Sequence, residues 1–419
     1  MSKARDIADS TTTLDVDGGT VKLDGNYPVG TNNVALGDNA GDAMASGGIG
    51  NTAIGSVALT DNTTGDNNTA VGYAALYVNS TGSENTAIGT EALQQSTTGS
   101  NGTAVGSAAL YANTTGAYNV AIGRSALESN TTASNNTAVG YQASYSSTET
   151  GGNTAVGYQS LYANTGSDNS ALGIRSLTSN TTGTKNTALG YDALTSNTTA
   201  AANTAVGYQA LTTNTTGGDN AAFGYQAAQS NTTGDYLTAI GRQALYNNTT
   251  ASYNTAVGYQ AAYSITGSQY NTAIGRGALY SHTTGNGGNV AVGYDANRSL
   301  TTGSNNVSVG ANAAYAMTTG LYNVALGGNA LRSNTTASNN TAVGYNAGYS
   351  NTTGIQNLFV GSDAGYANTT GSGNTYVGRG DSVAAGVLMT TGSKNTIIGG
   401  YTGNQGGLDI RTSSNNIVL

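Results

Sequence analysis

The sequence predicts an all-β fold, a parallel β-solenoid (β-roll) of about 21 coils with a 17-residue repeat. The first observation is a glycine that recurs from Gly37 to Gly399, at 17-residue spacing in 17 of 21 steps. The second is the strand-like motif before it, which reads Asn-Thr-Ala-Val-Gly in many copies. The third is the regular return of Val, Ile and Leu in a glycine-rich chain, a feature that disordered segments lack. Together they favour one elongated body over several globular domains.

Composition restricts the possible partners. The chain carries 13 Lys and Arg against 21 Asp and Glu, a net charge of −8, and the cations are widely spaced. No basic patch is available to neutralise a phosphate backbone, so we expect no nucleic acid partner. No apolar run approaches the ~20 residues that a membrane-spanning helix needs, so we expect no membrane insertion. Without cysteine, neither disulfides nor thiolate metal sites can form.

Residues 1–30 lie outside the repeat. Residues 11–17 and 20–23 alternate apolar and polar side chains around a pair of glycines, which predicts a hairpin. The single proline, Pro28, then marks a break. We therefore expect an N-terminal attachment or capping segment. An acidic residue stands where a signal peptide has its apolar core, so synthesis in the cytoplasm is expected.

Residues 31–378 form the repeat region. Its consensus is N-T-A-V-G-Y-x-A-L-Y-x-N-T-T-G-x-x, with positions one to seventeen numbered in that order. Positions two and four share one face of a strand because side chains alternate. Position four is aliphatic and position two is Thr or its isostere Val, which indicates a buried face. The representative core residues at position four are Val71, Val139, Val206 and Val257.

Position three is Ala in nearly every copy. Such a small residue on the opposite face indicates that this face also packs closely against something. Two covered faces on so short a strand predict a partner beyond the coil itself. If position four is the core, Val206→Asp buries an unpaired carboxylate at a cost of several kcal/mol.

The glycine at position five is expected to turn the chain at the end of the strand, since glycine tolerates positive φ. The representative turn glycines are Gly72, Gly140, Gly207 and Gly258. Ala and Leu at positions eight and nine supply a second apolar side, and the Asn-Thr-Thr-Gly that follows favours a loop. Four residues are too few for periodicity to decide whether the second segment is a strand or a helical turn.

Asparagine at position one predicts a ladder of side-chain amides that fixes the register of the coils. After Gly378 the pattern loosens. Residues 379–419 form an irregular last coil and a C-terminal segment, which ends in the apolar edge of residues 416–419. Because solenoid ends need capping, we expect a partner, another domain or further chain to cover this edge.

The sequence predicts neither an enzyme nor a cofactor or metal site. His282 is the only histidine, whereas a His-based triad or a three-ligand zinc site needs further His or Cys partners. Glycine runs such as residues 47–50 lack the Lys-Ser/Thr of a phosphate loop. The acidic side chains occupy scattered positions, which is typical of solvent-facing groups; examples are Asp61, Glu91, Glu128, Asp168, Asp192 and Asp295.

The recurrence of tyrosine at positions six and ten is the one sequence pattern that suggests a binding function. Stacked rings would protect the corners of the coils and join neighbouring chains. Alternatively, the amphipathic rings form a glycan-binding strip. The candidate glycan contacts at position six are Tyr73, Tyr141, Tyr158, Tyr208 and Tyr259.

Two strands carry a family resemblance. Residues 119–123 (N-V-A-I-G) and 289–293 (N-V-A-V-G) resemble the strand motif in the heads of trimeric autotransporter adhesins. That resemblance implies a left-handed β-roll with three chains packed about one axis. The longer coil with its Asn-Thr-Thr-Gly loop is more similar to repeats in tail-fibre and structural proteins of environmental bacteriophages, as are residues 1–8 and 401–411. An autotransporter's signal peptide, coiled-coil stalk and membrane anchor are not recognisable.

The resemblance favours a homotrimeric structural fibre of a phage tail or similar virion appendage, made in the host cytoplasm. Residues 1–30 would dock to a virion or tail protein, and the rod would space or present an end that contacts the host surface, with a surface glycan as a possible partner. One alternative is a bacterial cell-surface adhesin of the trimeric autotransporter head type. A second is an ice-binding β-solenoid, since N-T-A-V-G also resembles the N-x-V-x-G repeats of plant ice-binding proteins. Against ice binding, position two accepts Val and is expected to face inward.

Overall fold

The protein is an all-β parallel β-solenoid of about 22 turns with 17-residue spacing, as the sequence predicts. The computed structural model describes residues 32–44, 47–378 and 384–419, and no helix occurs among them. The chain divides into two compact units, residues 1–202 and 203–419. The hairpin and attachment segment predicted in residues 1–30 lie outside the described residues.

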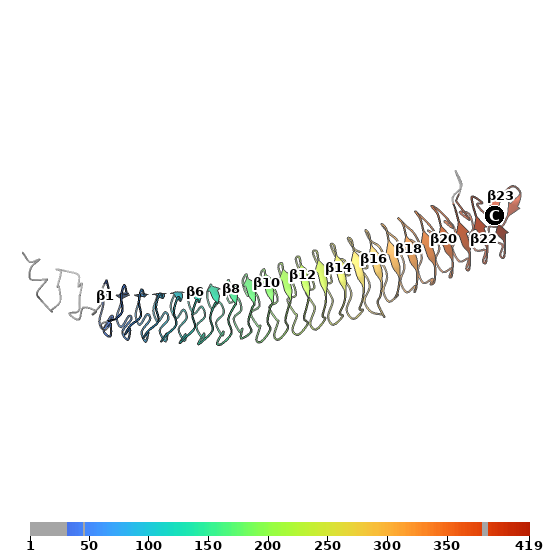
Figure 1. The fold of residues 1–419 in the computed structure, drawn as a ribbon. Helices are drawn as coiled ribbons and strands as arrows, with labels where there is room; N and C mark the ends of the chain where they lie inside the picture. Colours follow the sequence, from blue (N-terminus) through green and yellow to red (C-terminus); the bar gives the residue numbers. More distant parts are fainter. Residues whose placement is uncertain (1–31, 45–46, 379–383) are drawn as a thin grey trace, which may run out of the picture. The chain divides into compact units, whose positions relative to one another are not determined.

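In the first unit each coil contributes one three-residue strand to a parallel sheet, and consecutive strands pair in sequence order (Figure 1). The strands are β1 (Val34–Leu36), β2 (Thr52–Ile54), β3 (Thr69–Val71), β4 (Thr86–Ile88), β5 (Thr103–Val105), β6 (Val120–Ile122), β7 (Thr137–Val139), β8 (Thr154–Val156), β9 (Ser170–Leu172) and β10 (Thr187–Leu189).

The second unit repeats this arrangement and ends in a two-residue strand, β25, that pairs in parallel with β22. A short antiparallel hairpin, β23–β24, projects between them. The strands are β11 (Thr204–Val206), β12 (Ala221–Phe223), β13 (Thr238–Ile240), β14 (Thr255–Val257), β15 (Thr272–Ile274), β16 (Val290–Val292), β17 (Val307–Val309), β18 (Val324–Leu326), β19 (Thr341–Val343), β20 (Leu358–Val360), β21 (Thr375–Val377), β22 (Thr396–Ile398), β23 (Asn404–Gln405), β24 (Leu408–Asp409) and β25 (Ile417–Val418).

Stacking places like residues over like. In β7 and β8, for example, Thr137 lies opposite Thr154 and Ala138 opposite Ala155. Coils of other lengths keep this register: Thr154 pairs with Ser170 across the 16-residue spacing and Thr272 with Val290 across the 18-residue spacing. The extra or missing residues therefore fall in loops, which tolerate length changes better than strands do.

The core of each coil lies between Ala at position three and the Ala-Leu pair at positions eight and nine. Ala138 and Ala205 are fully buried, as are Leu127 and Leu211 on the opposite side. Burying a leucine contributes roughly 1.5–3 kcal/mol, so the second segment supplies most of the hydrophobic stabilisation of a coil.

The prediction that position four forms the core is wrong. Val71, Val139, Val206 and Val257 are half-buried and point away from the coil interior, as the burial pattern of their strands shows. The period of two distinguishes the two faces of the strand, but the inner face is the one that carries position three. Leu at position nine already fills most of the narrow interior, so Ala and not Val fits opposite it.

In two coils the usual sizes are reversed: position three carries a large residue and position nine carries glycine. Phe359 replaces the position-three Ala, and position nine is Gly365 in the same coil and Gly348 in the preceding coil. A Cβ added to either glycine would collide with the Phe359 ring. Tyr376 and Gly386 repeat the exchange in the next coil. The side chains at positions three and nine therefore fill the same interior space, and a large residue at one position requires a small residue at the other.

The position-five glycines end the strands in a backbone region that other residues avoid. Gly72, Gly140 and Gly207 all have φ of 137°, and Gly258 has φ of 134°. A Cβ on Gly258 would lie 2.7 Å from the carbonyl carbon and oxygen of Gly275 in the next coil. Both the turn and the close approach of neighbouring coils thus require glycine there.

The second segment is neither a strand nor a helical turn. Its residues form a run of tight turns in which positions seven and nine have positive φ, for example 52° at Gln142 and 52° at Leu127. Its backbone N–H groups bond to neighbouring coils, as Leu127 does to the carbonyl of Ala143 at 3.0 Å. A left-handed residue costs roughly 1–2 kcal/mol, which burial of the leucine side chain offsets.

Asparagines form two ladders inside the coils. At position one, as predicted, the backbone N–H of Asn340 donates to Oδ1 of Asn323 at 3.0 Å, and Asn357 donates to Oδ1 of Asn340 at 3.0 Å. Position twelve, predicted only as part of a loop, carries a second ladder in which Nδ2 of Asn368 donates to Oδ1 of Asn351 at 2.8 Å. Buried amides that are linked from coil to coil in this way fix the register of the coils.

Candidate functional surfaces

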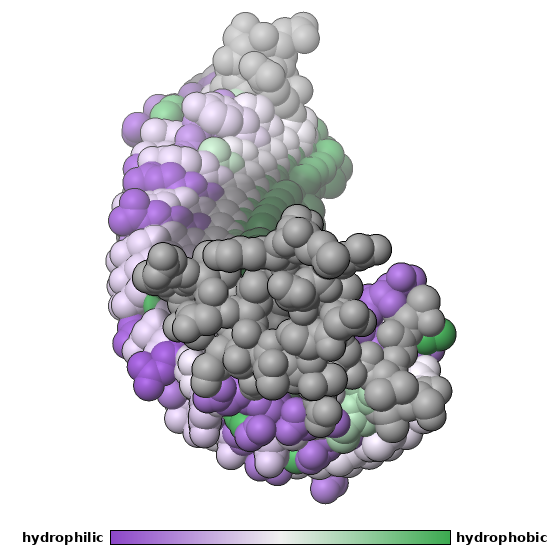
Figure 2. All heavy atoms as spheres, turned by 90° about the vertical axis from the view of Figure 1, so that its left-hand side faces the viewer, coloured by the Kyte–Doolittle hydropathy of each residue, from purple (hydrophilic) through white to green (hydrophobic). Residues whose placement is uncertain are grey.

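The outer face of the strands is an apolar strip. Positions two and four point outward, so a row of aliphatic or aromatic side chains at position four lies beside a row of Thr or Val at position two. Figure 2 shows part of this strip as green, hydrophobic side chains gathered on one side of the coils. The most exposed members at position four are Ile54, Ile88, Ile122, Leu172 and Leu189 in the first unit and Phe223, Ile240, Ile274, Val309, Leu326 and Ile398 in the second.

The strip results from the same repeat that builds the core. Exact register carries each position-four side chain over the next, as Ile240 pairs with Val257 and Val257 with Ile274. At the ~4.8 Å spacing of strands, the ten strands of the first unit give a strip about 45 Å long and two side chains wide. An apolar surface of that size is at the upper end of what a monomer leaves in water, and such surfaces mark interaction sites.

The position-six tyrosines are mostly engaged with their neighbours. The rings of Tyr141 and Tyr158 stack with centroids 5.4 Å apart, and those of Tyr208 and Tyr225 stack at 5.2 Å. The guanidinium of Arg242 lies 5.9 Å from the centroid of Tyr259, in a cation–π contact. Of the five candidate glycan contacts, only Tyr73 has neither a stacked ring nor a cation on its faces in the described structure.

Position ten carries a longer ladder in the second unit. Tyr246, Tyr263 and Tyr280 stack at 5.1 Å, and burial together with the flanking phenols raises the pKa of Tyr263. Arg298 then lies over the ring of Tyr280 at 4.8 Å, so arginine continues the stack where tyrosine is absent. Stacking of rings and guanidinium planes supports the interpretation that the position-ten tyrosines have a structural role.

A third tyrosine ladder, at position seventeen, was missed from the sequence. Tyr236, Tyr253 and Tyr270 stack at 5.0 Å and 5.1 Å, and about half or more of each side chain is exposed. Their spacing of 17 residues was visible in the sequence. The consensus concealed them because position seventeen holds Asn, Asp or other residues in most coils.

His282 occupies a position-twelve site inside the coil. It is fully buried, and its Nε2 lies 2.7 Å from Oγ of Ser268. Burial lowers its pKa to about 4. The side chain is therefore neutral at pH 7, and Ser268 connects it to the amide of Asn271 in the position-one ladder.

The acidic residues form no catalytic or metal-binding cluster in the described part of the chain. No group of three or more His, Asp or Glu side chains there is arranged to hold a metal ion. Several acids are instead ion-paired, as Asp192 is with Arg175 at 2.9 Å and Asp295 with Arg298 at 2.7 Å. None of the described residues forms a helix that could cross a membrane.

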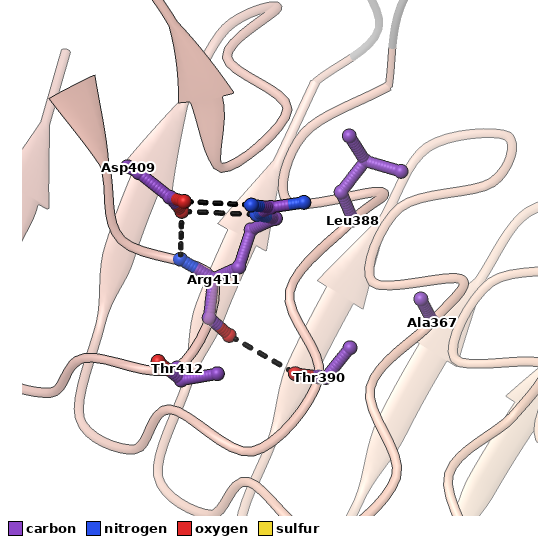
Figure 3. A pocket seen from close by; sticks show the side chains of 6 residues that line it. All are labelled: Ala367, Leu388, Thr390, Asp409, Arg411 and Thr412. Carbon is purple, nitrogen blue, oxygen red and sulfur yellow. Dashed lines mark hydrogen bonds and ion pairs between the residues drawn. The ribbon is translucent and has the colours of Figure 1, made fainter. Parts of the chain in front are cut away.

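A shallow pocket of about 400 Å³ lies beside the C-terminal hairpin, lined by Ala367, Leu388, Thr390, Asp409, Arg411 and Thr412 (Figure 3). Asp409 and Arg411 form an ion pair on one wall of the pocket, with 2.7 Å between Oδ2 and the guanidinium, and the arginine lowers the pKa of Asp409 to about 2. Because each charge satisfies the other, the pocket offers no free ion to a ligand.

The sequence matches no protein-family model and no curated protein. The surfaces described above are therefore the features that indicate a function. Of these, the apolar strip is the largest and the most regular.

Proposed function

We propose that the chain is a subunit of a homotrimeric fibre, a phage tail fibre or similar virion appendage, in which the apolar strips of three copies face one another. The observation that supports this proposal is the outward row of aliphatic side chains at position four, which a single chain leaves in water. Burying apolar area at roughly 25 cal/mol per Å² would stabilise such an assembly.

The strip also gives the predicted partner a different location. Sequence reasoning placed it against the alanine face, but that face packs inside the coil. In this proposal the partner chains contact the face that carries positions two and four. A flat strip on one side of every coil allows long parallel copies to associate along their whole length, which suits a fibre. The trimeric state and the left-handed coil follow from the resemblance to autotransporter heads.

In this proposal residues 1–30 attach the fibre to a virion or tail protein, and the repeat region spaces or presents a host-contacting end. The bacterial surface adhesin of the autotransporter head type remains an alternative for the same assembly. The two differ in location and not in packing. Detection of the protein in purified phage particles, by mass spectrometry, would decide for the appendage.

The direct test of the proposal is the solution mass of the purified chain by multi-angle light scattering. We expect about three times the chain mass of 41.6 kDa. A single-chain mass at micromolar concentration would contradict the fibre, because the strip would then be exposed to water in the native protein.

A second candidate function, ice binding, is favoured by one observation. The threonines of position two face outward on a flat sheet, contrary to the expectation that they face inward. This removes one of the arguments against an ice-binding solenoid. Ice binding needs the strip to be free, so it requires a single-chain mass together with thermal hysteresis. A trimer without thermal hysteresis excludes it.

A further inference from the structure

Tyr345 differs from the other position-six tyrosines in its surroundings. Its neighbours at position six are Gly328 on one side and Ser362 on the other. It stacks on no ring and carries no guanidinium in the described structure, and its side chain is 58% exposed, the highest value in the column. Gly328 has no side chain that could stack on the ring, although the ring lies close to it: a Cβ there would be 3.4 Å from Cδ2 of Tyr345.

A row of linked polar side chains runs beside this ring at position seven. Nδ2 of Asn329 donates to Oδ1 of Asn346 at 3.1 Å, and Nδ2 of Asn346 donates to Oδ1 of Asp363 at 3.0 Å. Each amide has two N–H donors, and one of each is used along the row. The row thus keeps donors and the Oδ1 acceptor of Asn329 at a fixed place next to an open aromatic face.

We propose that Tyr345, Asn329 and Asn346 form a binding site for one pyranose ring of a neutral saccharide. The apolar C–H face of the sugar packs on the tyrosine ring, and the amides exchange hydrogen bonds with its hydroxyl groups. The carboxylate of Asp363 and the net charge of −8 disfavour anionic sugars. This inference rests on the proposed function, in which the fibre contacts a host-surface glycan.

The chain supplies its own matched comparison. Tyr73 also stands at position six, is 55% exposed and has small neighbours, Ser56 and Thr90. The position-seven residues beside it are Val57 and Ala74, which offer no hydrogen bonds through their side chains. An exposed ring alone would make Tyr73 and Tyr345 equivalent, whereas the polar row distinguishes Tyr345.

The test uses the full chain on immobilised oligosaccharides of neutral hexoses and N-acetylhexosamines, with sialylated and sulfated ones alongside. We expect at least one neutral oligosaccharide to be retained, and Tyr345→Ala to weaken its Kd at least tenfold. Asn329→Asp, which replaces the amide by a residue that the repeat already uses at position seven, should weaken it several-fold. Tyr73→Ala should leave the Kd unchanged.

Three results would overturn the site: no neutral oligosaccharide retained, equal binding by Tyr345→Ala, or an equal loss in Tyr73→Ala. Circular dichroism and the light-scattering mass of each variant verify that the fold and the assembly are intact. The mass also separates the two proposals, because a single-chain mass refutes the fibre whether or not Tyr345 binds saccharide.

Discussion

Amide and small side chains, more than large apolar ones, determine how each coil stacks on the next. An asparagine at position one satisfies backbone groups of two coils at once, and an alanine at position three lets the strand approach the leucine layer. A buried polar group contributes little net free energy when it is paired but costs about 1–3 kcal/mol when its partner is lost. The ladders therefore act chiefly by making any other register unfavourable.

Asn340 tests the position-one ladder. Asn340→Ala removes the acceptor of the Asn357 backbone N–H and the donor to the carbonyl of Gly354. The backbone N–H of Asn357 then lacks a partner, whereas the carbonyl of Gly354 keeps the Nδ2 of Asn351 at 2.9 Å, so the free energy of unfolding should fall by about 1–3 kcal/mol in urea titrations. Asn247→Ala is the control, because the side chain of Asn247 is partly exposed and makes no hydrogen bond in the described structure. Equal effects of the two variants would show that the ladder contributes nothing specific.

His282 predicts a pH dependence of stability. Its pKa is lowered from 6.5 to about 4, so between these values the unfolded chain binds a proton that the folded chain does not. Stability is therefore highest above pH 6.5, falls as the pH drops towards 4, and loses at most about 3 kcal/mol from this residue. His282→Leu, which matches Leu300 at the same repeat position, should remove this part of the slope in chemical denaturation from pH 7 to 4. An unchanged slope would contradict the assignment.

At the scale of one coil, the stabilising unit is the pair formed by positions three and nine. Ala lies opposite Leu in most coils, whereas Phe359 lies between Gly348 and Gly365. The combined volume of the two side chains stays similar, and only its distribution between positions three and nine changes, because the interior is as tightly packed as an organic crystal. The same pairing offered a signal in the sequence: the two largest position-three residues, Phe359 and Tyr376, accompany glycines where leucine is usual.

Gly365→Ala tests this pairing. The added methyl collides with the Phe359 ring, so overpacking should lower the free energy of unfolding by about 1–3 kcal/mol. Positive φ is not the obstacle, since Ala228 occupies the same repeat position at φ of 48°. In a Phe359→Ala background the cost of Gly365→Ala should largely vanish, which a double-mutant cycle by urea denaturation would measure. Additive effects would mean that the two positions do not share a volume.

At the scale of the whole molecule, the inner and outer faces of the strands have separate consequences. The inner face folds a coil, and the outer face leaves an apolar strip on each unit. A substitution on the strip should therefore affect association and spare the fold. This differs from the consequence of a buried position four, where Val206→Asp was expected to unfold the coil.

Ile240→Lys combined with Ile274→Lys tests the strip. Both isoleucines are about 40% exposed in the single chain, so the lysines can reach water and the β-sheet circular dichroism should be retained. In the proposed assembly the charges would be desolvated, at several kcal/mol each, and the light-scattering mass should fall to that of one chain. Thr233→Lys with Thr250→Lys adds the same charge on exposed loop positions and should leave the mass unchanged. A trimer that survives the isoleucine variant would place the contact elsewhere.

The tyrosine columns at positions six and ten were predictable from spacing, because any residue repeated every 17 positions must stack in this fold. Which rings remain open was not. Whether a ring face is covered depends on the residue one coil away, for instance Arg242 beside Tyr259 or Gly328 beside Tyr345. The candidate site at Tyr345 therefore emerged only from the stacked structure.

The sequence by itself determined the parallel solenoid, its 17-residue coil, the turn glycines and the position-one ladder, because near-identical repeats bury their apolar sides only by stacking like over like. Which face of each strand is the inner one became clear from the packing of the folded coils. Alternation in a strand distinguishes two faces without ranking them, and the choice depends on the thickness of the interior. That interior is already filled by Leu at position nine and Asn at positions one and twelve, so Ala turns inward and Val turns outward.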